Sequence, residues 1–359
     1  MKDHLSVLVL TTEGLTSHIG GLGTYIREFR HRAPKAGGLD VRFHQIPFDA
    51  RYLLHSRFDN TLSTLLREAD VVHANDYFTT YAALLRRRHA KIVTVVHMLH
   101  QRFSYEGQKN CLGLTSDELK YAERAALSRS DLLVAVSDFI ATELSFLGIA
   151  LPPVTVVHNG AGDSFFDSQY VPRPAVTRIG ICGRLIEQKG ADMIPAILAR
   201  LTEVPFPWTM EVVGAGPQQA LLEQSVTTCK LTGQCNLRGW VPYDRMPTIY
   251  SGWHVTLSLS RYEPFGIAPL ESLAAGTPVL GSVVGGMHDY CEDGHNAICA
   301  RKVDADSLVG RLVTYCSRSR PLERDQVRRS VTRFRWDRTV AQMQELYCSV
   351  VASQASLRA

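Results

Sequence analysis

The sequence predicts an α/β protein made of two Rossmann-like, doubly wound parallel-sheet domains that face a cleft. Short apolar runs bounded by turn residues alternate with helical patterns, and this alternation stops near the middle of the chain and then starts afresh. A length of 359 residues with 45% hydrophobic content suits two cores of ordinary size. A ligand of such a protein is expected at the carboxyl ends of the strands.

The first half carries strand-like runs separated by helical patterns, which is typical of a parallel sheet covered on both faces. The expected strands are residues 5–10, 41–46, 71–73, 92–97, 132–136 and 154–157. The expected helices lie near residues 22–33, 60–68, 77–87, 115–128 and 138–147. These elements define a first domain over residues 1–165.

The second half repeats the pattern after residues 163–178, which contain two prolines and no periodicity and are therefore expected to be a linker. The expected strands are residues 179–182, 210–213, 236–239, 255–259 and 279–281. The expected helices are residues 190–201, 217–229, 243–252, 266–275 and 304–316. The second domain then covers residues 174–335.

The last stretch, residues 336–359, is expected to form a C-terminal helix that packs back towards the first domain. Val340, Met343, Leu346 and Tyr347 recur there at helical spacing. The arginines that precede this stretch favour a solvated face over a binding patch.

Composition excludes several classes of protein. A net charge of +4 spread over the chain is too small for a nucleic-acid footprint, so no nucleic-acid partner is expected. The apolar run at residues 5–10 is too short to span a membrane and reads as a strand, which favours a cytoplasmic protein. The eight cysteines form no Cys-x-x-Cys pair, so free thiols are expected rather than disulfides or a zinc site.

The stretch from Arg261 to Glu271 is the strongest functional signal. An apolar strand passes through Gly266 into a helix, so backbone N–H groups at the helix start favour an anion such as a phosphate. Glu263 lies in the loop and Glu271 in the early helix. Taken singly, Glu263 could equally be a solvated loop residue and Glu271 a partner of a neighbouring element.

Two cations follow the first strand of the second domain. Arg184 and Lys189 lie five residues apart in a loop before a helix, a pairing that suits the spread charge of a diphosphate. A solvated loop is the alternative for this segment alone. Gly20 and Gly21 open the first helix of the chain, where glycine lets the backbone approach a phosphate, although one glycine-rich turn is weak evidence.

Polar residues end two strands of the first domain. His97 ends one strand and is followed by His100, while His73 and Asp76 end another strand on the same rim. His97 is as well explained as a core histidine as by function. A metal at His97 and His100 lacks a carboxylate or cysteine nearby at ligand spacing, so no metal site is predicted.

With these motifs in order, the chain resembles the retaining glycosyltransferases of the GT-B fold, family 4, also called glycosyltransferase group 1. The resemblance covers nearly the whole chain. The matching motifs are Gly20-Gly21, His97, Val136-Ser137, Asn159-Gly160, Gly183-Arg184 with Lys189-Gly190, Val213 to Pro217, Glu263 with Glu271, Gly276 to Val279 and Gly285-Gly286. Asn296 departs from the family pattern, which often has a glycine there.

The resemblance implies roles for these residues. Arg184 and Lys189 would hold the donor diphosphate, Glu271 the ribose and Glu263 the transferred sugar. The backbone from Gly266 through Ile267 to Ala268, beside Phe265, would cradle a phosphate. Gly21 would contact the diphosphate and His97 the reacting sugar. Gly23, Asp76, His100 and Asn159 are candidates for the acceptor side.

The expected reaction is transfer of a sugar from a nucleotide sugar to an acceptor hydroxyl, without a required cofactor. UDP-sugars are the favoured donors, with GDP- or ADP-sugars as alternatives, and the acceptor is expected to be a small metabolite such as a cyclitol or aminocyclitol, or a saccharide. A nucleotide-sugar epimerase and a non-catalytic sugar-nucleotide-binding protein are the alternative functions. Basic residues 86–89 would allow peripheral membrane contact, but a solvated helix end is favoured.

Overall fold

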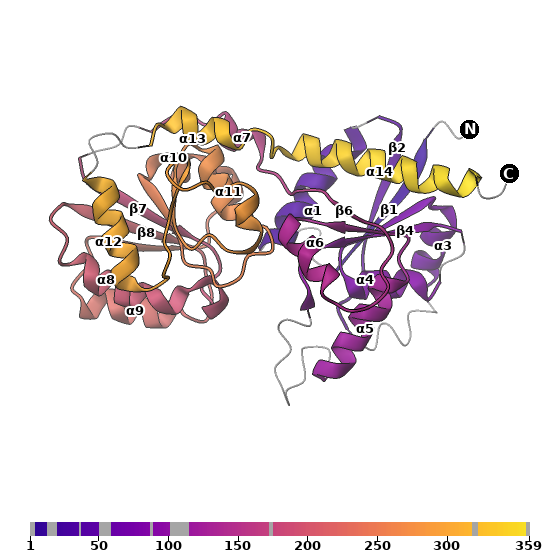
Figure 1. Cartoon of the computed structure of the whole chain (residues 1–359), viewed down its shortest axis with the longest axis horizontal. Helices are drawn as coiled ribbons and strands as arrows, with labels where there is room; N and C mark the ends of the chain where they lie inside the picture. The colour runs from indigo at the N-terminus through magenta and orange to yellow at the C-terminus, as the bar shows by residue number, and fades with distance from the viewer. Residues whose placement is uncertain are drawn as a thin grey trace. The chain divides into compact units, whose positions relative to one another are not determined.

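The computed structural model describes residues 4–12, 20–35, 37–49, 59–86, 89–100, 115–171, 175–317 and 322–356. The chain divides into two compact units. The first consists of Met1–Asn159 together with Trp336–Ala359, and the second is Gly160–Arg335. The two parallel sheets confirm the predicted fold class of two Rossmann-like domains (Figure 1).

The first unit is built on a six-stranded parallel sheet with the order β2-β1-β3-β4-β5-β6. Its strands are β1 (Leu5–Thr11), β2 (Leu39–Gln45), β3 (Val71–Ala74), β4 (Lys91–Val96), β5 (Leu132–Ala135) and β6 (Val154–Val156). Residues 7–10 of β1 are all buried, as expected for a central strand covered on both faces. The direction of winding reverses between β1 and β3, which makes their carboxyl ends a preferred ligand site.

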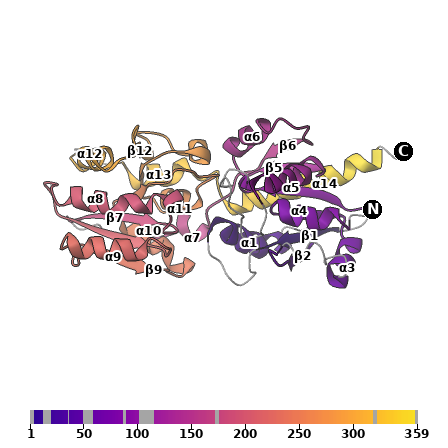
Figure 2. The same ribbon diagram turned by 90° about the horizontal axis from the view of Figure 1, so that it is seen from below.

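Helices cover both faces of this sheet (Figure 2). They are α1 (Gly21–Arg32), α3 (Asn60–Glu68), α4 (Tyr77–Leu84), α5 (Ser116–Ser128) and α6 (Asp138–Ser145), with a short η1 turn (Ala33–Lys35). Apolar residues of α3, α4 and α5 form one continuous core with β1 and β4. Side chains at the helix starts account for local folding, since Asp59, Asp76, Thr115 and Ser137 each accept a backbone N–H at the start of a helix.

The C-terminal helix α14 (Trp336–Ser356) belongs to the first unit and contacts α1 and β4. Trp336, Val340, Met343 and Tyr347 are buried, at the spacing that places them on one face of the helix. The Gln344 side chain also donates a hydrogen bond to the carbonyl oxygen of Gly37, at 2.7 Å. The chain thus crosses to the second unit and returns to finish the first.

The second unit has a parallel sheet with the order β12-β11-β10-β7-β8-β9. Its strands are β7 (Thr177–Cys182), β8 (Trp208–Val213), β9 (Cys235–Gly239), β10 (Val255–Ser258), β11 (Val279–Gly281) and β12 (Ala297–Cys299). The winding reverses between β7 and β10, which are neighbours in this sheet. Their carboxyl ends are therefore the expected ligand site of this unit.

Helices α8, α9 and α12 cover one face of this sheet, and α7, α10, α11 and α13 cover the other. The helices are α7 (Asp163–Phe166), α8 (Ile194–Leu201), α9 (Gln219–Thr228), α10 (Met246–Gly252), α11 (Ile267–Ala274), α12 (Ala305–Cys316) and α13 (Arg324–Ser330). Short turns of 3₁₀ helix are η4 (Glu187–Lys189), η5 (Ala191–Met193), η6 (Tyr243–Arg245) and η7 (Gly285–Asp289).

Three elements differ from the sequence prediction. The expected linker contains α7, whose Phe165 and Phe166 are buried and which contacts α10 and α11. The first unit therefore ends at Asn159, before the expected boundary at residue 165. The edge strand β12 and the helix α13 were not predicted.

The arginines around the start of α14 form the expected solvated face only in part, since Arg329, Arg333 and Arg338 are exposed. Arg324 and Arg328 of α13 are half-buried and lie over the Tyr170 ring, at 4.0 and 4.3 Å from its centroid. Arg328 also donates to the carbonyl oxygen of Ser168, at 2.8 Å, and Arg335 pairs with Asp163 at 2.7 Å. These side chains tie α13 and the chain after it to the start of the second unit.

The seven cysteines in the described ranges are free thiols, as their spacing predicts. Within the described residues, no helix is both long enough and apolar enough to cross a bilayer. Arg86, in the basic run after α4, donates to the carbonyl oxygen of Ala82 at 3.0 Å, as a helix-end residue would. Arg87 and Arg88 lie outside the described residues.

Candidate active site

A pocket lies inside the second unit, at the carboxyl ends of β7 and β10. The segment after β7 contributes Arg184 and Lys189, and the segment after β10 contributes Ser260 and Glu263. Ala268, in the first turn of α11, lines the same pocket. The structure therefore brings the two predicted cations, one predicted carboxylate and the predicted helix start together at the point where the winding of the sheet reverses.

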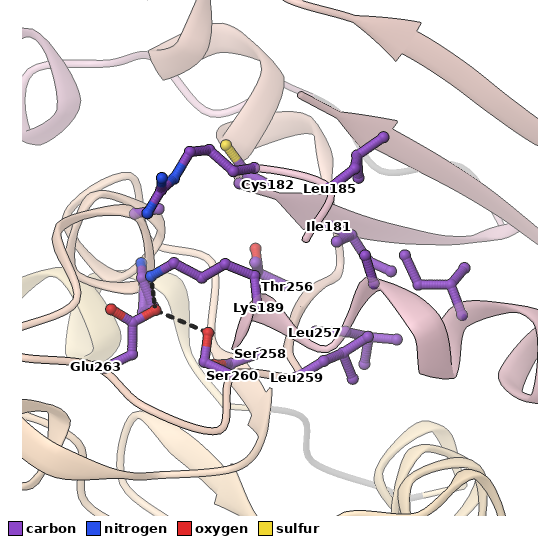
Figure 3. A pocket seen from close by; sticks show the side chains of 16 residues that line it. Ile181, Cys182, Leu185, Lys189, Thr256, Leu257, Ser258, Leu259, Ser260 and Glu263 are labelled. Atoms are coloured by element: carbon purple, nitrogen blue, oxygen red, sulfur yellow. Dashed lines mark hydrogen bonds and ion pairs between the residues drawn. The ribbon is translucent and has the colours of Figure 1, made fainter. Parts of the chain in front are cut away.

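Lys189 and Glu263 form an ion pair in this pocket (Figure 3). The Lys189 ammonium lies 2.6 Å from Oε1 of Glu263, and the Ser260 hydroxyl donates to the same oxygen at 2.8 Å. Only 7% of the Glu263 side chain is exposed, against 24% for Lys189. The second carboxylate oxygen of Glu263 receives no hydrogen bond from the described residues, so it has capacity for a ligand hydroxyl.

Gly190 shapes the turn that carries Lys189. Its φ of 71° is left-handed, and a Cβ at this position would lie 2.2 Å from the carbonyl oxygen of Leu259. The turn after β7 thus packs directly on the backbone that leaves β10. Only glycine combines this conformation with so close an approach.

A second contact locks these two segments together. The Arg261 guanidinium makes two 2.7 Å hydrogen bonds to the Asp192 carboxylate, and its backbone N–H donates to the carbonyl oxygen of Gln188 at 2.9 Å. The Arg261 guanidinium lowers the pKa of Asp192 below its usual value. Asp192 was not predicted from sequence, because nothing in the local pattern pairs it with a residue 69 positions away.

Arg184 follows β7 on the exposed side of the pocket. Its guanidinium makes no hydrogen bond or ion pair with the residues that the structure describes. The backbone around it is fixed, because Leu185 donates to the carbonyl oxygen of Ala215 at 3.0 Å and a Cβ on Gly214 would lie 1.9 Å from the carbonyl oxygen of Gly183. A fixed backbone and an uncommitted guanidinium suit the capture of an anion.

Gly266 marks the start of α11, with a φ of 89°. Its carbonyl oxygen accepts a 2.6 Å hydrogen bond from the Tyr290 hydroxyl, and Phe265 before it is buried. No acidic residue occupies the first turn, so no side chain of that turn neutralises the amides of Ile267 and Ala268. Glu271 is buried in the next turn of this helix.

Cys182 lines the pocket at the end of β7. Burial raises the pKa of its thiol to about 12, with a smaller contribution from the nearby Glu271 carboxylate. The thiol therefore stays protonated at neutral pH and is a weak nucleophile. The chemistry of this pocket consists of two cations, a carboxylate and helix amides.

In the first unit, the predicted glycines lie at the start of α1. Gly20 precedes the helix with a φ of 91°, and Gly21 is the first helical residue. Both are exposed, whereas Gly23 is buried inside the helix. The backbone of Gly21 is thus accessible and that of Gly23 is not.

His97 follows β4 and belongs to a buried hydrogen-bond network. Its Nε2 lies 3.2 Å from Oδ1 of Asn75, which also lies 3.2 Å from Nε2 of His73. The Nδ1 atom of His73 lies 2.6 Å from the hydroxyl of Tyr347 in α14. Asn75 and Tyr347 were not predicted as partners of this site, although Asn75 stands between the predicted residues His73 and Asp76 in the chain.

The other acceptor-side candidates have local partners. The Asp76 carboxylate accepts from the backbone N–H of Thr79 at 2.7 Å and so caps α4, and the backbone N–H of His100 donates to the Glu123 carboxylate at 2.7 Å. Asn159 is buried, and its side-chain oxygen accepts no hydrogen bond from the described residues. Burial lowers the pKa of His100 below its usual value.

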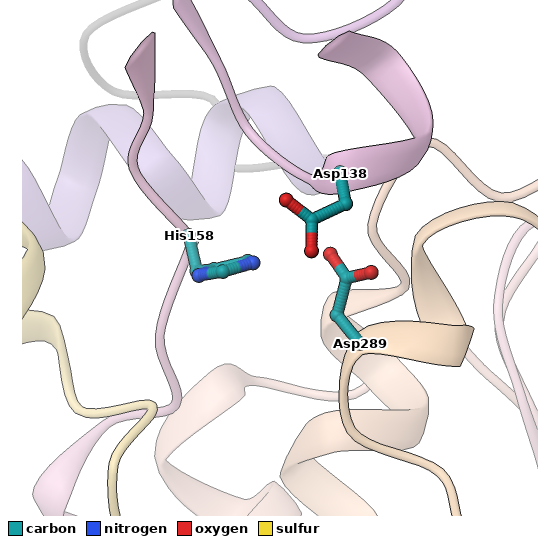
Figure 4. A group of neighbouring side chains, drawn as sticks. All are labelled: Asp138, His158 and Asp289. Carbon is teal, nitrogen blue, oxygen red and sulfur yellow. The ribbon is translucent and has the colours of Figure 1, made fainter. Parts of the chain in front are cut away.

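Several titratable residues outside the pocket belong to other elements of the two units. Asp138 begins α6 and His158 follows β6, both in the first unit, whereas Asp289 ends η7 in the second (Figure 4). Asp304 caps α12 by accepting from the N–H of Ser307 at 2.8 Å.

Each of the two units matches a known protein family. Residues 24–164 match the family described as glycosyltransferase family 4, and residues 171–329 match the one described as glycosyl transferases group 1. Sucrose-phosphate synthase from Thermosynechococcus elongatus shares the fold, with a TM-score of 0.81 over 98% of this chain and 100% of that chain at 19% identity. The chain belongs to the GT-B glycosyltransferases. This finding confirms the family that the sequence motifs suggested.

Curated relatives of this glycosyltransferase match it over different shares of their length, and the chain spans little more than half of the glycogen synthase that it matches. Glycogen synthase from Mycobacterium tuberculosis is 26% identical over 242 residues, which cover 67% of this chain and 58% of that protein. Alpha-maltose-1-phosphate synthase from Mycolicibacterium smegmatis is 25% identical over 97% of this chain and 100% of that protein. A 2-deoxystreptamine glucosyltransferase from Streptomyces kanamyceticus is 34% identical over 33% of this chain and 31% of that protein.

Asn296 shows how this glycosyltransferase accommodates a departure from the family pattern. Its side-chain N–H₂ donates to the carbonyl oxygen of Tyr290 and to the Ser330 hydroxyl, both at 2.8 Å. Its side-chain oxygen accepts from the N–H of Glu292, also at 2.8 Å. All of these partners lie outside the pocket lining, so Asn296 stabilises the loop that leads into β12.

Proposed function

We propose that this glycosyltransferase transfers a sugar from a nucleoside diphosphate sugar to an acceptor hydroxyl, with retention of configuration at the anomeric carbon. The observation that carries the proposal is the pocket at the ends of β7 and β10. There Lys189 pairs with Glu263 at 2.6 Å, and Arg184 lines the exposed side without a partner among the described residues. This combination of cations, a carboxylate and helix amides matches the charges and hydroxyls of a nucleotide sugar.

The diphosphate is assigned to Arg184, Lys189 and the first turn of α11. The Lys189 ammonium has three N–H donors and uses one on Glu263, so it retains donors for a phosphate oxygen. Arg184 adds the planar set of N–H donors of its guanidinium, and the backbone N–H groups of Ile267 and Ala268 at the start of α11 are available to a phosphate. Together they neutralise the charge that develops on the departing nucleotide, the kind of electrostatic contribution that dominates many enzymes.

The hydroxyl groups of the donor are assigned to the two buried acids. Glu263 faces the transferred sugar with its second carboxylate oxygen, and Glu271 binds the ribose. From the first unit, Gly21 contributes a backbone contact to the diphosphate and His97 contacts the transferred sugar. The leaving phosphate can accept the acceptor's proton, so this scheme requires no dedicated general base.

The acceptor is proposed to be a small soluble metabolite, such as a cyclitol or aminocyclitol, or a saccharide. The relatives named above support both classes by their names, since one is a 2-deoxystreptamine glucosyltransferase and others are a glycogen synthase and a maltose-1-phosphate synthase. On the acceptor side we retain His100 and Asn159. Gly23 is buried in α1 and Asp76 caps α4, so both already have structural roles.

Mass spectrometry with UDP-, GDP- and ADP-sugars tests this function. Donor alone is expected to give slow release of nucleoside diphosphate and free sugar, and a suitable polyol or saccharide is expected to gain one sugar mass. The anomeric configuration of the product, read by NMR, should match that of the donor. Conversion of the donor to an epimer without nucleotide release would support the epimerase instead, and binding without turnover across a broad acceptor panel would support a non-catalytic binding protein.

A further inference from the structure

The Asn75 side chain lies between two histidines of the first unit. Its Oδ1 atom is 3.2 Å from Nε2 of His97 and 3.2 Å from Nε2 of His73. Its Nδ2 atom donates a 2.8 Å hydrogen bond to the carbonyl oxygen of Leu10 in β1. Asn75 and His73 are fully buried, so water does not compete for these bonds.

The Leu10 contact fixes the direction of the amide. A carbonyl oxygen only accepts hydrogen bonds, so the Asn75 atom facing Leu10 must be the N–H₂ group, and the atom facing the histidines must be the acceptor oxygen. An acceptor oxygen stabilises a ring nitrogen only if that nitrogen carries a proton. Because Asn75 is the hydrogen-bond partner of Nε2 of His97, this nitrogen is assigned the proton. Nε2 of His73 also lies 3.4 Å from the Tyr25 hydroxyl, at a longer distance than from Asn75, and is assigned a proton that it donates to Asn75.

The second ring nitrogen of His73, Nδ1, has a partner that agrees with this assignment. Its Nδ1 atom then carries a lone pair and accepts the Tyr347 hydroxyl at 2.6 Å. Burial lowers the pKa of His73 to about 3, so the ring is neutral and holds only one proton. With this tautomer both ring nitrogens of His73 have a partner, and the Tyr25 hydroxyl at 3.4 Å can act as a second acceptor for the Nε2 proton.

His97, protonated on Nε2 in the same way, is left with a lone pair on Nδ1. Burial, with smaller effects of His73 and His100, lowers the pKa of His97 to about 3, so this ring is also neutral at pH 7. The described residues supply no hydrogen bond to its Nδ1 atom. His97 is half-buried, whereas His73 is fully buried, so part of His97 is accessible to a ligand.

We propose that Asn75 is a positioning residue, which holds His97 as the neutral Nε2–H tautomer so that Nδ1 accepts a hydrogen bond from a hydroxyl group of the bound sugar or acceptor. The identity of the ligand rests on the proposed function, whereas the tautomer does not. His97 accepts a hydrogen bond in this arrangement, and no proton is transferred.

NMR of protein with ¹⁵N-labelled histidine rings tests the tautomer directly. The signals of His73 and His97 are assigned with His73→Gln and His97→Gln variants. At pH 7 without ligand, both rings are expected to show a protonated Nε2 and an unprotonated Nδ1. A protonated Nδ1 on His97 would overturn the proposal.

Two variants of Asn75 separate positioning from simple structural support. Asn75→Leu removes the acceptor, so the His97 signals should shift towards a tautomer mixture and kcat should fall about 10–100-fold, within the range of a misplaced catalytic partner. Asn75→Asp loses the donor to Leu10 but keeps an acceptor for His97, and should keep the Nε2 proton. An unchanged His97 tautomer in a folded Asn75→Leu protein would contradict the proposal, and the Asn75→Asp protein still tests it if the leucine variant does not fold.

The Asn75→Asp variant also gives a prediction for the direction in which activity changes with pH. The titratable groups that face His97 are His73, His100 and the Tyr25 hydroxyl, to which Asn75→Asp adds a carboxylate. That carboxylate raises the pKa of His97, and protonation below this pKa removes the Nδ1 lone pair. Activity of Asn75→Asp should therefore fall as the pH is lowered, whereas His97 of the wild type does not titrate between pH 6 and 8. An aspartate variant whose pH profile matches the wild type would count against the role of Nδ1.

The Tyr347→Phe variant is the matched control within the network. It removes the donor to Nδ1 of His73 but leaves Asn75 in place, so the His97 tautomer should be unchanged. A shift of the His97 tautomer in this variant would show that Asn75 does not set it. If no donor binds or reacts at all, the proposed function fails while the tautomer result stands.

Discussion

At the scale of single residues, the site depends on how its charges are distributed before any ligand arrives. The Lys189–Glu263 pair is mostly shielded from water, with Ser260 as a third partner. Shielding from water strengthens the attraction between the two charges, and the pair in turn holds the Lys189 ammonium in a fixed position in the pocket. Arg184, which makes no such pair with the described residues, is the more adaptable of the two cations.

Lys189→Ala should therefore affect turnover more than folding. The loss of one preorganised cation is expected to lower kcat/KM about 10²–10³-fold, while unfolding should become easier by only about 1 kcal/mol because Ser260 still binds Glu263. Steady-state kinetics and chemical denaturation measure the two effects. Lys302→Ala is the control, since Lys302 is 85% exposed and lies outside the pocket, and undiminished turnover in a folded Lys189→Ala protein would remove the assigned role.

Gly190→Ala should destabilise the second unit. Its left-handed φ alone costs about 1–3 kcal/mol for a residue with a Cβ, and the clash with the Leu259 carbonyl adds to this cost. Gly310→Ala is the matched control, because Gly310 is exposed within α12 with open space around the position of an added Cβ, and should stabilise by about 0.5–1 kcal/mol. Denaturant unfolding compares the two, and equal stability would show that the turn tolerates a side chain.

At the scale of elements, α14 completes the core of the first unit from the other end of the chain. Its Trp336, Val340, Met343 and Tyr347 side chains are buried. Burial of each large apolar side chain contributes about 1.5–3 kcal/mol, so their sum is comparable with the whole stability of a typical domain.

A chain that ends at Arg335 should consequently lose the folded first unit. Circular dichroism and proteolysis are expected to show a protected second unit and a degraded first one. A chain that ends at Ser356 is the control and should behave like the full-length protein, because the buried residues of α14 remain. Full protection of the first unit without α14 would contradict this account.

The elements with clear apolar runs or helical periodicity were predictable from sequence, whereas α7, β12 and α13 were not. Strands such as β1 carry continuous apolar runs, and α11 is apolar on nearly every side, so their burial could be read directly. By contrast, β12 has three residues, and α13 is rich in arginine because Arg324 and Arg328 pack on Tyr170. Such long-range pairing leaves no local pattern in the sequence.

The candidate site was predictable to the same extent. Arg184, Lys189, Glu263 and the helix start at Gly266 stand in short motifs at strand ends, where parallel sheets collect functional groups. The contacts that hold these residues were not predictable, since Arg261 and Asp192 meet only in the folded chain. Asn75 was missed for the same reason, because its role depends on two histidines from different strands.

At the scale of the whole molecule, the pocket assigned to the donor lies entirely within the second unit. A bound nucleotide should therefore stabilise that unit in particular. At a concentration about 100 times Kd, binding contributes about 2.7 kcal/mol, which corresponds to a rise of about 5–10 °C in the unfolding temperature of a domain of this size.

Differential scanning calorimetry should resolve this effect. Two transitions are expected, and the one that is lost or shifted in Gly190→Ala should rise more than the other with added nucleoside diphosphate, because the first unit is assigned only the Gly21 contact to the diphosphate. An equal shift of both transitions would show that the nucleotide contacts both units with similar energy. A shift confined to the other transition would place the nucleotide in the first unit.

Calorimetric titration of UDP, GDP and ADP into the wild type and into an Arg184→Ala, Lys189→Ala double variant tests the central claim most directly. We expect one of these nucleotides to bind the wild type at one site per chain, and to bind the folded double variant at least about 100-fold more weakly, since each charge-assisted contact is worth about 1.5–3 kcal/mol. Equal affinity for both proteins, or no binding of any of the three to the wild type, would contradict the assignment of this pocket to a nucleoside diphosphate.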